Sequence, residues 1–260
     1  MNAKLKRFAH SLADAAGEAI MPFYRTEFTP ENKGEVGTFD PVTAADRAAE
    51  RAMRDLIVAH YPQHGIIGEE FGPENHEAEF VWALDPIDGT KSFMSGVPLW
   101  GTLIGLLHEG SAILGVSDHA FLRERFWGDG QESFGSGPLG QRRLVARHSV
   151  RLADAVVFAG STAATQPALH AQLGRLAASV RMVRYGADCY DTNMLAEGHI
   201  DAIVQTGLDI YDIAATIPIV TGAGGIVTGL DGGPALASST ILSSGSPILH
   251  AELLELFATL

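Results

Sequence analysis

Near the start of the chain, apolar side chains recur every three or four positions in two long stretches. The first covers residues 5–23 and the second covers residues 43–57. This spacing places the apolar side chains on one face of an amphipathic helix, which buries that face against a core. In the second stretch, Thr43 is followed three positions later by Asp46, a hydroxyl residue and an acid in the order typical of a helix start. We therefore predict two long helices, joined by a polar loop over residues 29–40 that contains Lys33.

Shorter apolar runs follow, and they predict strands. One run, residues 66–68, leads into the acidic pair Glu69 and Glu70. Two more, residues 99–107 and 111–117, flank a glycine turn and predict a hairpin, and a fourth covers residues 121–127.

The segment 128–140 is rich in glycine and has no periodicity, which is typical of a boundary between two parts of a chain. We predict an N-terminal α+β half, residues 1–135, and a C-terminal α/β half, residues 136–260. The second half alternates between strand-like and helix-like patterns, which indicates α/β layering. The predicted strands are 180–185, 200–204, 226–228 and 240–242, and the predicted helices are 188–197, 211–220 and 249–260.

Composition narrows the class of protein. With 260 residues and 46% hydrophobic side chains, the chain is long and apolar enough to fold around a large core. Its formal net charge of −13 argues against binding the phosphate backbone of nucleic acid. Cys189 is the only cysteine, which favours a reducing compartment. No apolar run approaches the roughly 18 residues of a membrane span. We therefore expect a soluble cytoplasmic protein that binds neither nucleic acid nor membrane.

Candidate chemistry concentrates in the stretch Trp82-Ala83-Leu84-Asp85-Pro86-Ile87-Asp88-Gly89-Thr90. Proline cannot donate a sheet hydrogen bond, so we expect the strand to stop at Asp85 and to leave both aspartates at its end. Carboxylates without cationic neighbours repel one another unless a hard cation lies between them, and Mg²⁺ prefers oxygen ligands. The stretch therefore predicts a metal site.

Gly89 and Thr90 follow the two aspartates and precede a helical turn. Free backbone N–H groups at a helix start bind anions, so a phosphate could sit on Gly89 and Thr90 while it contacts a metal held by Asp85 and Asp88. An isolated Asp-Gly-Thr would be a plain Asx turn. The complete string is more specific, and Gly68-Glu69-Glu70 and Tyr211-Asp212 point the same way.

Taken in order, Thr43-Ala44-Ala45-Asp46, Gly68-Glu69-Glu70, Asp85-Pro86-Ile87-Asp88-Gly89-Thr90 and Tyr211-Asp212 resemble the inositol monophosphatase superfamily of Mg²⁺-dependent phosphatases, over essentially the whole chain. Within it, Thr90 to Gly96, Pro98 to Ile104, Arg123 to Gly128 and Gly186-Ala187-Asp188-Cys189-Tyr190 are similar to the histidinol-phosphate phosphatase branch. The resemblance implies a layered α/β/α/β/α fold, of mixed α/β (α+β) class, and a homodimer.

The resemblance also implies roles for individual residues. Two or three Mg²⁺ ions would be held by Glu69, Asp85, the Ile87 carbonyl, Asp88 and Asp212. A water polarised by Mg²⁺ and oriented by Glu69 and Thr90 would attack phosphorus in line, without a phosphoenzyme. Asp46 would hydrogen-bond Thr90, a role compatible with capping its helix. An acid at the position of Asp212 would also favour a helix start by itself, so its metal role depends on the resemblance.

The substrate implied by the branch is histidinol phosphate, a small phosphate ester with an ammonium and an imidazole group. Acidic or amide side chains suit such a substrate. Asp188 and Asp209 are candidates, besides Gly89 and Thr90 for the phosphate, although Asp188 could equally be a helix N-cap. Many relatives carry a glutamate where this chain has Gln205, which weakens the attraction for a cation.

Two alternatives remain open. One is a phosphatase for inositol 1-phosphate or for sugar phosphates in general, although inositol-directed relatives usually carry tryptophan where this chain has Tyr211. The other is an accessory protein of transcription or RNA processing whose phosphatase activity is dispensable. The intact set Glu69, Asp85, Asp88, Thr90 and Asp212 favours an enzyme.

Overall fold

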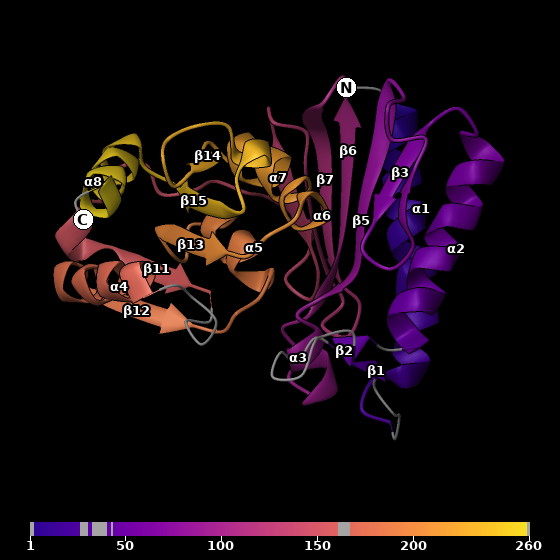
Figure 1. The fold of residues 1–260 in the computed structure, drawn as a ribbon, viewed down its shortest axis with the longest axis horizontal. Helices are drawn as coiled ribbons and strands as arrows, with labels where there is room; N and C mark the ends of the chain where they lie inside the picture. The colour runs from indigo at the N-terminus through magenta and orange to yellow at the C-terminus, as the bar shows by residue number, and fades with distance from the viewer. Residues whose placement is uncertain (1–2, 27–30, 33–40, 43, 161–166, 259–260) are drawn as a thin grey trace.

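The fold consists of two sheets separated and flanked by helices (Figure 1). The computed structural model describes residues 3–26, 31–32, 41–42, 44–160 and 167–258. An eight-stranded sheet has the order β10-β9-β8-β7-β6-β5-β3-β4, and a five-stranded sheet has the order β12-β11-β13-β15-β14. Strands β1 (Glu31–Asn32) and β2 (Pro41–Val42) form a separate antiparallel pair.

The larger sheet is mostly antiparallel, and only β3 and β5 run parallel. Its strands are β3 (Gly65–Gly68), β4 (Gly72–Glu74), β5 (Phe80–Asp88), β6 (Gly101–His108), β7 (Ser111–His119), β8 (Glu124–Gly128), β9 (Ser133–Ser136) and β10 (Arg142–Arg143).

Helices α1 (Ala3–Ile20) and α2 (Ala44–His60) cover one face of this sheet and pack against each other (Figure 1). Several alanines of both helices are buried in the main core cluster, and Leu12, Ile20 and Met53 belong to the same cluster as Trp82 of β5. Burying each such side chain contributes roughly 1.5–3 kcal/mol. The predicted pair of N-terminal helices is thus confirmed, whereas Thr43 and Lys33 lie outside the described residues.

The second half supplies the smaller sheet and two more helix layers. Its strands are β11 (Val156–Ala159), β12 (Met182–Tyr185), β13 (Ala202–Thr206), β14 (Ile226–Gly229) and β15 (Thr240–Ser244). Helices α5 (Tyr190–Ala196), α6 (Ile210–Ile213) and α7 (Thr216–Gly222) lie between the two sheets, and α4 (Pro167–Ser179) and α8 (Pro247–Ala258) cover the outer face. This arrangement confirms the predicted α/β/α/β/α layering.

Two details differ from the sequence-based predictions. Strand β5 does not stop at Asp85, because a bulge carries it through Pro86 to Asp88. The predicted helix over residues 211–220 is two short helices, and Pro218 is tolerated in the first turn of α7, where its missing N–H would have no helical acceptor. The larger sheet continues past residue 135 through β9 and β10, and the division of the chain into the halves 1–135 and 136–260 stays a prediction.

Several elements were not predicted from the sequence, among them β4, β9 and β10 in the larger sheet, and β11 and α4. β11 is short, and α4 has a weak separation of apolar and polar faces, so neither gave a clear pattern. Among the described residues, no helix combines the length and the apolarity that a bilayer crossing requires.

Candidate active site

The end of β5 forms the centre of the site. Residues up to Leu84 pair with β3, and Asp85 and Asp88 pair with Leu103 and Gly101 of β6. Pro86 and Ile87 thus lie opposite a single residue, Thr102, in a bulge that needs no ladder N–H from the proline. The Thr102 hydroxyl donates to the Pro86 carbonyl at 2.8 Å. The bulge therefore presents Asp85 and Asp88 at the carboxyl end of an interior strand of the sheet.

Gly89 makes the turn from this strand into helix α3 (Thr90–Met94). Its φ of +82° is a left-handed conformation that glycine adopts without strain, and a side chain there would collide with Asp188. The Thr90 hydroxyl donates to the Ile87 carbonyl at 3.1 Å. Asp46 is buried in the first turn of α2. Its predicted hydrogen bond with Thr90 stays a prediction.

Asp212 comes from the other half of the chain, at the start of α6. Its Oδ2 atom accepts the Asp209 backbone N–H at 2.7 Å, and the Asp209 side chain accepts the N–H of Asp212 in return. This capping box fixes the carboxylate of Asp212 and gives the helix-start interpretation of this residue a physical basis. The same carboxylate also faces β5, so the two interpretations of Asp212 are compatible.

The structure brings three of the predicted metal ligands together. One carboxylate oxygen from each of Asp85, Asp88 and Asp212 lies within 4.8 Å of the other two. Asp85 is buried, and its Oδ1 atom accepts no hydrogen bond from any residue that the structure describes. Such an oxygen is costly in a protein unless a cation contacts it. The cluster therefore fits a divalent metal bound through hard oxygen ligands.

Electrostatics support this conclusion. Burial raises the pKa of Asp85 well above its ordinary value, and repulsion from Glu69, Asp88 and Asp212 raises it further. Burial, followed by repulsion from Asp212 and Asp188, raises the pKa of Asp88 to about 7. Burial raises the pKa of Asp212 to about 6. Without a cation the cluster thus resists full ionisation, and a bound cation would reverse this effect.

Glu69 lies in the turn that follows β3, and its backbone N–H donates to the Leu84 carbonyl at 3.2 Å. This contact holds the turn beside the end of β5. The negative charge of Glu69 is near enough to act on Asp85. The predicted role of Glu69 in metal binding or in orienting a water stays a prediction.

The predicted substrate contacts lie in three places. Asp188 faces the motif, where its Oδ2 atom accepts the Ser92 hydroxyl of α3 at 2.5 Å. Gln205 donates through its side-chain amide to both carboxylate oxygens of Asp191, each at 3.2 Å. Asp209 is the N-cap of α6 and also accepts the Tyr211 hydroxyl at 3.0 Å. The helix-cap alternative for Asp188 is wrong, because α5 begins at Tyr190 with Cys189 as its N-cap.

Several residues that shape this site gave no functional signal in the sequence. The Cys189 backbone N–H donates to Asp88 Oδ2, and Ser92 and Asp191 hold two predicted substrate residues. A backbone donor leaves no signal in a side-chain pattern. An acid in the first turn of a helix, such as Asp191, is ordinarily explained by the helix dipole.

Comparison with known proteins agrees with this geometry. The model of the inositol monophosphatase family matches residues 1–260. The chain belongs to the inositol monophosphatase family. It is 36% identical to the "Bifunctional phosphatase IMPL2, chloroplastic" of Arabidopsis thaliana, over 97% of this chain and 75% of that protein. It is 35% identical to the "Histidinol-phosphatase" of Mycobacterium tuberculosis, over 95% of each chain.

Among solved structures, an inositol monophosphatase from Zymomonas mobilis superposes with a TM-score of 0.86 at 32% identity, covering 99% of this chain and 100% of that one. The family and the acidic cluster together identify the protein as a metal-dependent phosphomonoesterase of the inositol monophosphatase family. A phosphorylated small molecule is the substrate that this family implies.

Proposed function

We propose that this phosphatase hydrolyses histidinol phosphate to histidinol and phosphate, with two or three Mg²⁺ ions held by Asp85, Asp88, Asp212, Glu69 and the Ile87 carbonyl. The acidic cluster at the β5 bulge supports the metal assignment, because its three carboxylates need a cation to ionise together. Bound Mg²⁺ supplies charge neutralisation and a water of lowered pKa.

The chain's own groups then have distinct tasks. The Glu69 carboxylate accepts a hydrogen bond from the attacking water, and the Thr90 hydroxyl fixes the orientation of that water. Asp46 holds Thr90 from helix α2. The phosphate rests on the backbone N–H groups of Gly89 and Thr90, where α3 begins.

The Asp188 carboxylate is the observation that carries the choice of substrate. It lies against Gly89 and Ser92, next to the proposed phosphate position. A carboxylate there attracts a substrate that carries a positive charge, which an uncharged polyol lacks. Histidinol phosphate has such a charge on its amino group. The similarity to the histidinol-phosphatase of Mycobacterium tuberculosis supports the same choice.

Gln205 is compatible with a cationic substrate despite its lack of charge. Its amide nitrogen donates to Asp191, and this contact assigns the positions of the amide nitrogen and the amide oxygen. The amide oxygen is then the end that can accept a hydrogen bond from an ammonium group. Asp209, beside Asp212 in the capping box, adds a further negative charge next to the metal cluster.

Inositol 1-phosphate is the second candidate, because the Zymomonas mobilis structure of an inositol monophosphatase covers the whole fold at 32% identity. Measurements of kcat/KM for histidinol phosphate and inositol 1-phosphate in Mg²⁺ distinguish the two. We expect histidinol phosphate to be preferred by at least about tenfold, which corresponds to about 1.4 kcal/mol. A preference of that size for inositol 1-phosphate would replace the proposal, and activity that persists in EDTA would contradict the role of Mg²⁺.

A further inference from the structure

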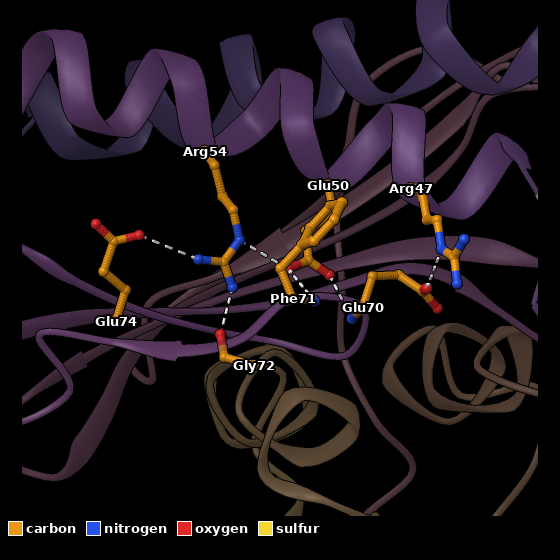
Figure 2. Close-up of polar contacts among 7 residues, drawn as sticks. All are labelled: Arg47, Glu50, Arg54, Glu70, Phe71, Gly72 and Glu74. Atoms are coloured by element: carbon orange, nitrogen blue, oxygen red, sulfur yellow. Dashed lines mark hydrogen bonds and ion pairs between the residues drawn. The ribbon is translucent and has the colours of Figure 1, made fainter. Parts of the chain in front are cut away.

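A buried carboxylate on helix α2, outside the metal cluster, contacts the turn that carries Glu69. Glu50 is fully buried, and its Oε2 atom accepts the Glu70 backbone N–H at 2.7 Å (Figure 2). Its Oε1 atom accepts the Phe71 backbone N–H at 3.2 Å and the Nε of Arg54 at 2.7 Å. Glu50 thus binds two consecutive backbone donors that directly follow Glu69.

Arg54, one turn further along α2, completes this contact. Its guanidinium pairs with Glu50, donates to the Gly72 carbonyl and lies 3.4 Å from the exposed carboxylate of Glu74 (Figure 2). A buried carboxylate is costly unless it is both paired and hydrogen-bonded, and Arg54 and the two amides meet that need. The pair is therefore held in one geometry.

The backbone of β3 is shaped to accept Glu50. A Cβ atom on Gly68 would collide with Glu50 Oε1, so only glycine allows the carboxylate to reach the turn. On the other side of Glu50, Arg47 forms an ion pair of 3.6 Å with Glu70. Arg47, Glu50 and Arg54 are three and four residues apart, so they share one face of α2.

Glu50 contacts none of the three aspartates of the metal cluster in these hydrogen bonds, so its influence must pass through the turn. The Glu69 N–H is fixed to Leu84 at the start of the turn, and Glu50 fixes the next two N–H groups. The charge of Glu69 acts on Asp85 from this position. A shift of the turn would therefore move Glu69 relative to the cluster.

We propose that Glu50 is a positioning residue: its carboxylate, held by Arg54, fixes the Glu69–Phe71 turn so that Glu69 reaches the metal cluster. This inference rests on the proposed role of Glu69 in the phosphatase site. If Glu50 has this role, its substitution weakens Mg²⁺ binding and lowers kcat. A purely structural role predicts a loss of stability alone.

The test compares Glu50→Gln with the matched control Glu74→Gln. The first substitution keeps the size of the side chain but turns one acceptor into a donor, which opposes one of its three partners. Glu74→Gln removes the exposed partner of Arg54 without a change at the turn. For Glu50→Gln we expect the half-saturating Mg²⁺ concentration to rise about tenfold or more and kcat at saturating Mg²⁺ to fall, with the substrate KM little changed. The control should stay within about twofold of wild type.

Hydrogen exchange gives a second readout that does not depend on activity. The Glu70 and Phe71 amides should exchange faster in Glu50→Gln than in the control, and Mg²⁺ binding measured by calorimetry without substrate should weaken. If only the unfolding temperature fell, while Mg²⁺ affinity, kcat and these amides matched the control, the proposal would be wrong.

Two further outcomes also test the proposal. If Glu50→Gln does not fold, Arg54→Lys replaces it, because lysine keeps the charge but cannot contact Glu50 and the Gly72 carbonyl together. An unchanged Mg²⁺ affinity in Arg54→Lys would then overturn the proposal. If the wild-type protein hydrolyses no phosphate ester, the proposed function fails, while the exchange and calorimetry experiments still decide the role of Glu50.

Discussion

The backbone N–H of Cys189 donates a hydrogen bond to Oδ2 of Asp88, and this bond joins the second half of the chain to the acidic motif at the end of β5. Asp188, the preceding residue, adopts a left-handed φ of +47°, which turns the chain so that its own carboxylate meets Ser92 while the next N–H meets Asp88. One turn therefore supports a predicted metal ligand and presents a predicted substrate contact.

Asp188→Asn should separate these two tasks. Asparagine retains an oxygen that accepts the Ser92 hydroxyl and favours a positive φ, but it lacks the negative charge. We expect KM for histidinol phosphate to rise at least about tenfold, because a charge-assisted contact contributes roughly 1.5–3 kcal/mol. KM for an uncharged phosphate ester such as glycerol 2-phosphate should stay close to that of wild type.

Ser92→Ala is the matched control for this prediction, since it removes the hydrogen bond but keeps the charge of Asp188. It should leave the ratio of the two KM values near that of wild type. If Asp188→Asn raises both KM values equally, Asp188 supports the site as a whole and does not recognise the cation.

Local sequence sufficed to predict the centre of the site. The string from Asp85 to Thr90 contains much of its own geometry, because Pro86 restricts the backbone and Gly89 permits the left-handed turn that follows the two aspartates. The stop at Asp85 was nonetheless wrong. Proline excludes a ladder hydrogen bond, but a bulge removes the need for one, and a bulge depends on the register with β6.

Residue patterns do not predict contacts between distant segments of the chain. Asp212 fits a helix start without any metal, and only the resemblance assigned it to the cluster where the structure places it. Glu50 looks like an ordinary helix residue, because its partners are backbone N–H groups that no residue pattern identifies. Sequence patterns report local geometry, whereas these roles arise from packing between elements.

Mg²⁺ binding should depend on pH through Asp88 and Asp212. Without metal their pKa values lie at about 7 and about 6, so at pH 6 protons occupy much of the Asp88 carboxylate and compete with the cation. We expect Mg²⁺ affinity, measured by calorimetry, to rise about tenfold or more from pH 6 to pH 8. An affinity that stays constant over this range would contradict the raised pKa values.

The raised pKa values of Asp88 and Asp212 also predict how the stability of the metal-free protein depends on pH. A carboxyl whose pKa is higher in the folded state than in the unfolded state binds more protons when folded, so its contribution to stability falls as pH rises from about 4 to about 7. Bound Mg²⁺ stabilises the ionised carboxylates and so removes this loss of stability. The increase in unfolding temperature caused by Mg²⁺ should therefore be larger at pH 8 than at pH 5.5, as a thermal denaturation series in Mg²⁺ and in EDTA would reveal.

Asp88→Asn should abolish most activity and yet stabilise the metal-free protein. Asparagine can still accept the Cys189 N–H, but it removes one of the clustered negative charges. We expect kcat to fall by more than about 100-fold, while the free energy of unfolding in EDTA at pH 8 rises by roughly 1–3 kcal/mol. Urea denaturation of the wild type and the variant in EDTA measures this free energy of unfolding. A variant that is both inactive and less stable would indicate that Asp88 has a structural role instead.

A final prediction concerns His119, which is buried between the larger sheet and α5. One ring nitrogen, Nδ1, lies 2.8 Å from the Trp100 carbonyl, so it carries the proton. The other, Nε2, lies 2.7 Å from the side-chain nitrogen of Asn193 and therefore accepts. A proton on Nε2 would point at the Asn193 donor, which disfavours the charged ring. Burial likewise lowers the pKa of His119, to about 4. The neutral ring thus links β7 to the helix that follows Cys189.

His119→Ala should destabilise the protein by roughly 2–4 kcal/mol at pH 8, since it leaves a cavity and unpaired groups on Trp100 and Asn193. Because the folded state binds fewer protons than the unfolded state between about pH 4 and 6.5, the wild type loses the benefit of a neutral His119 as pH falls through this window. Urea denaturation should therefore show that the difference between wild type and variant shrinks below pH 6.5, by at most about 1.4 kcal/mol per pH unit. A difference that stays constant from pH 8 to pH 5 would mean that His119 titrates alike in both states, and the neutral ring would then not be what holds α5 against the sheet.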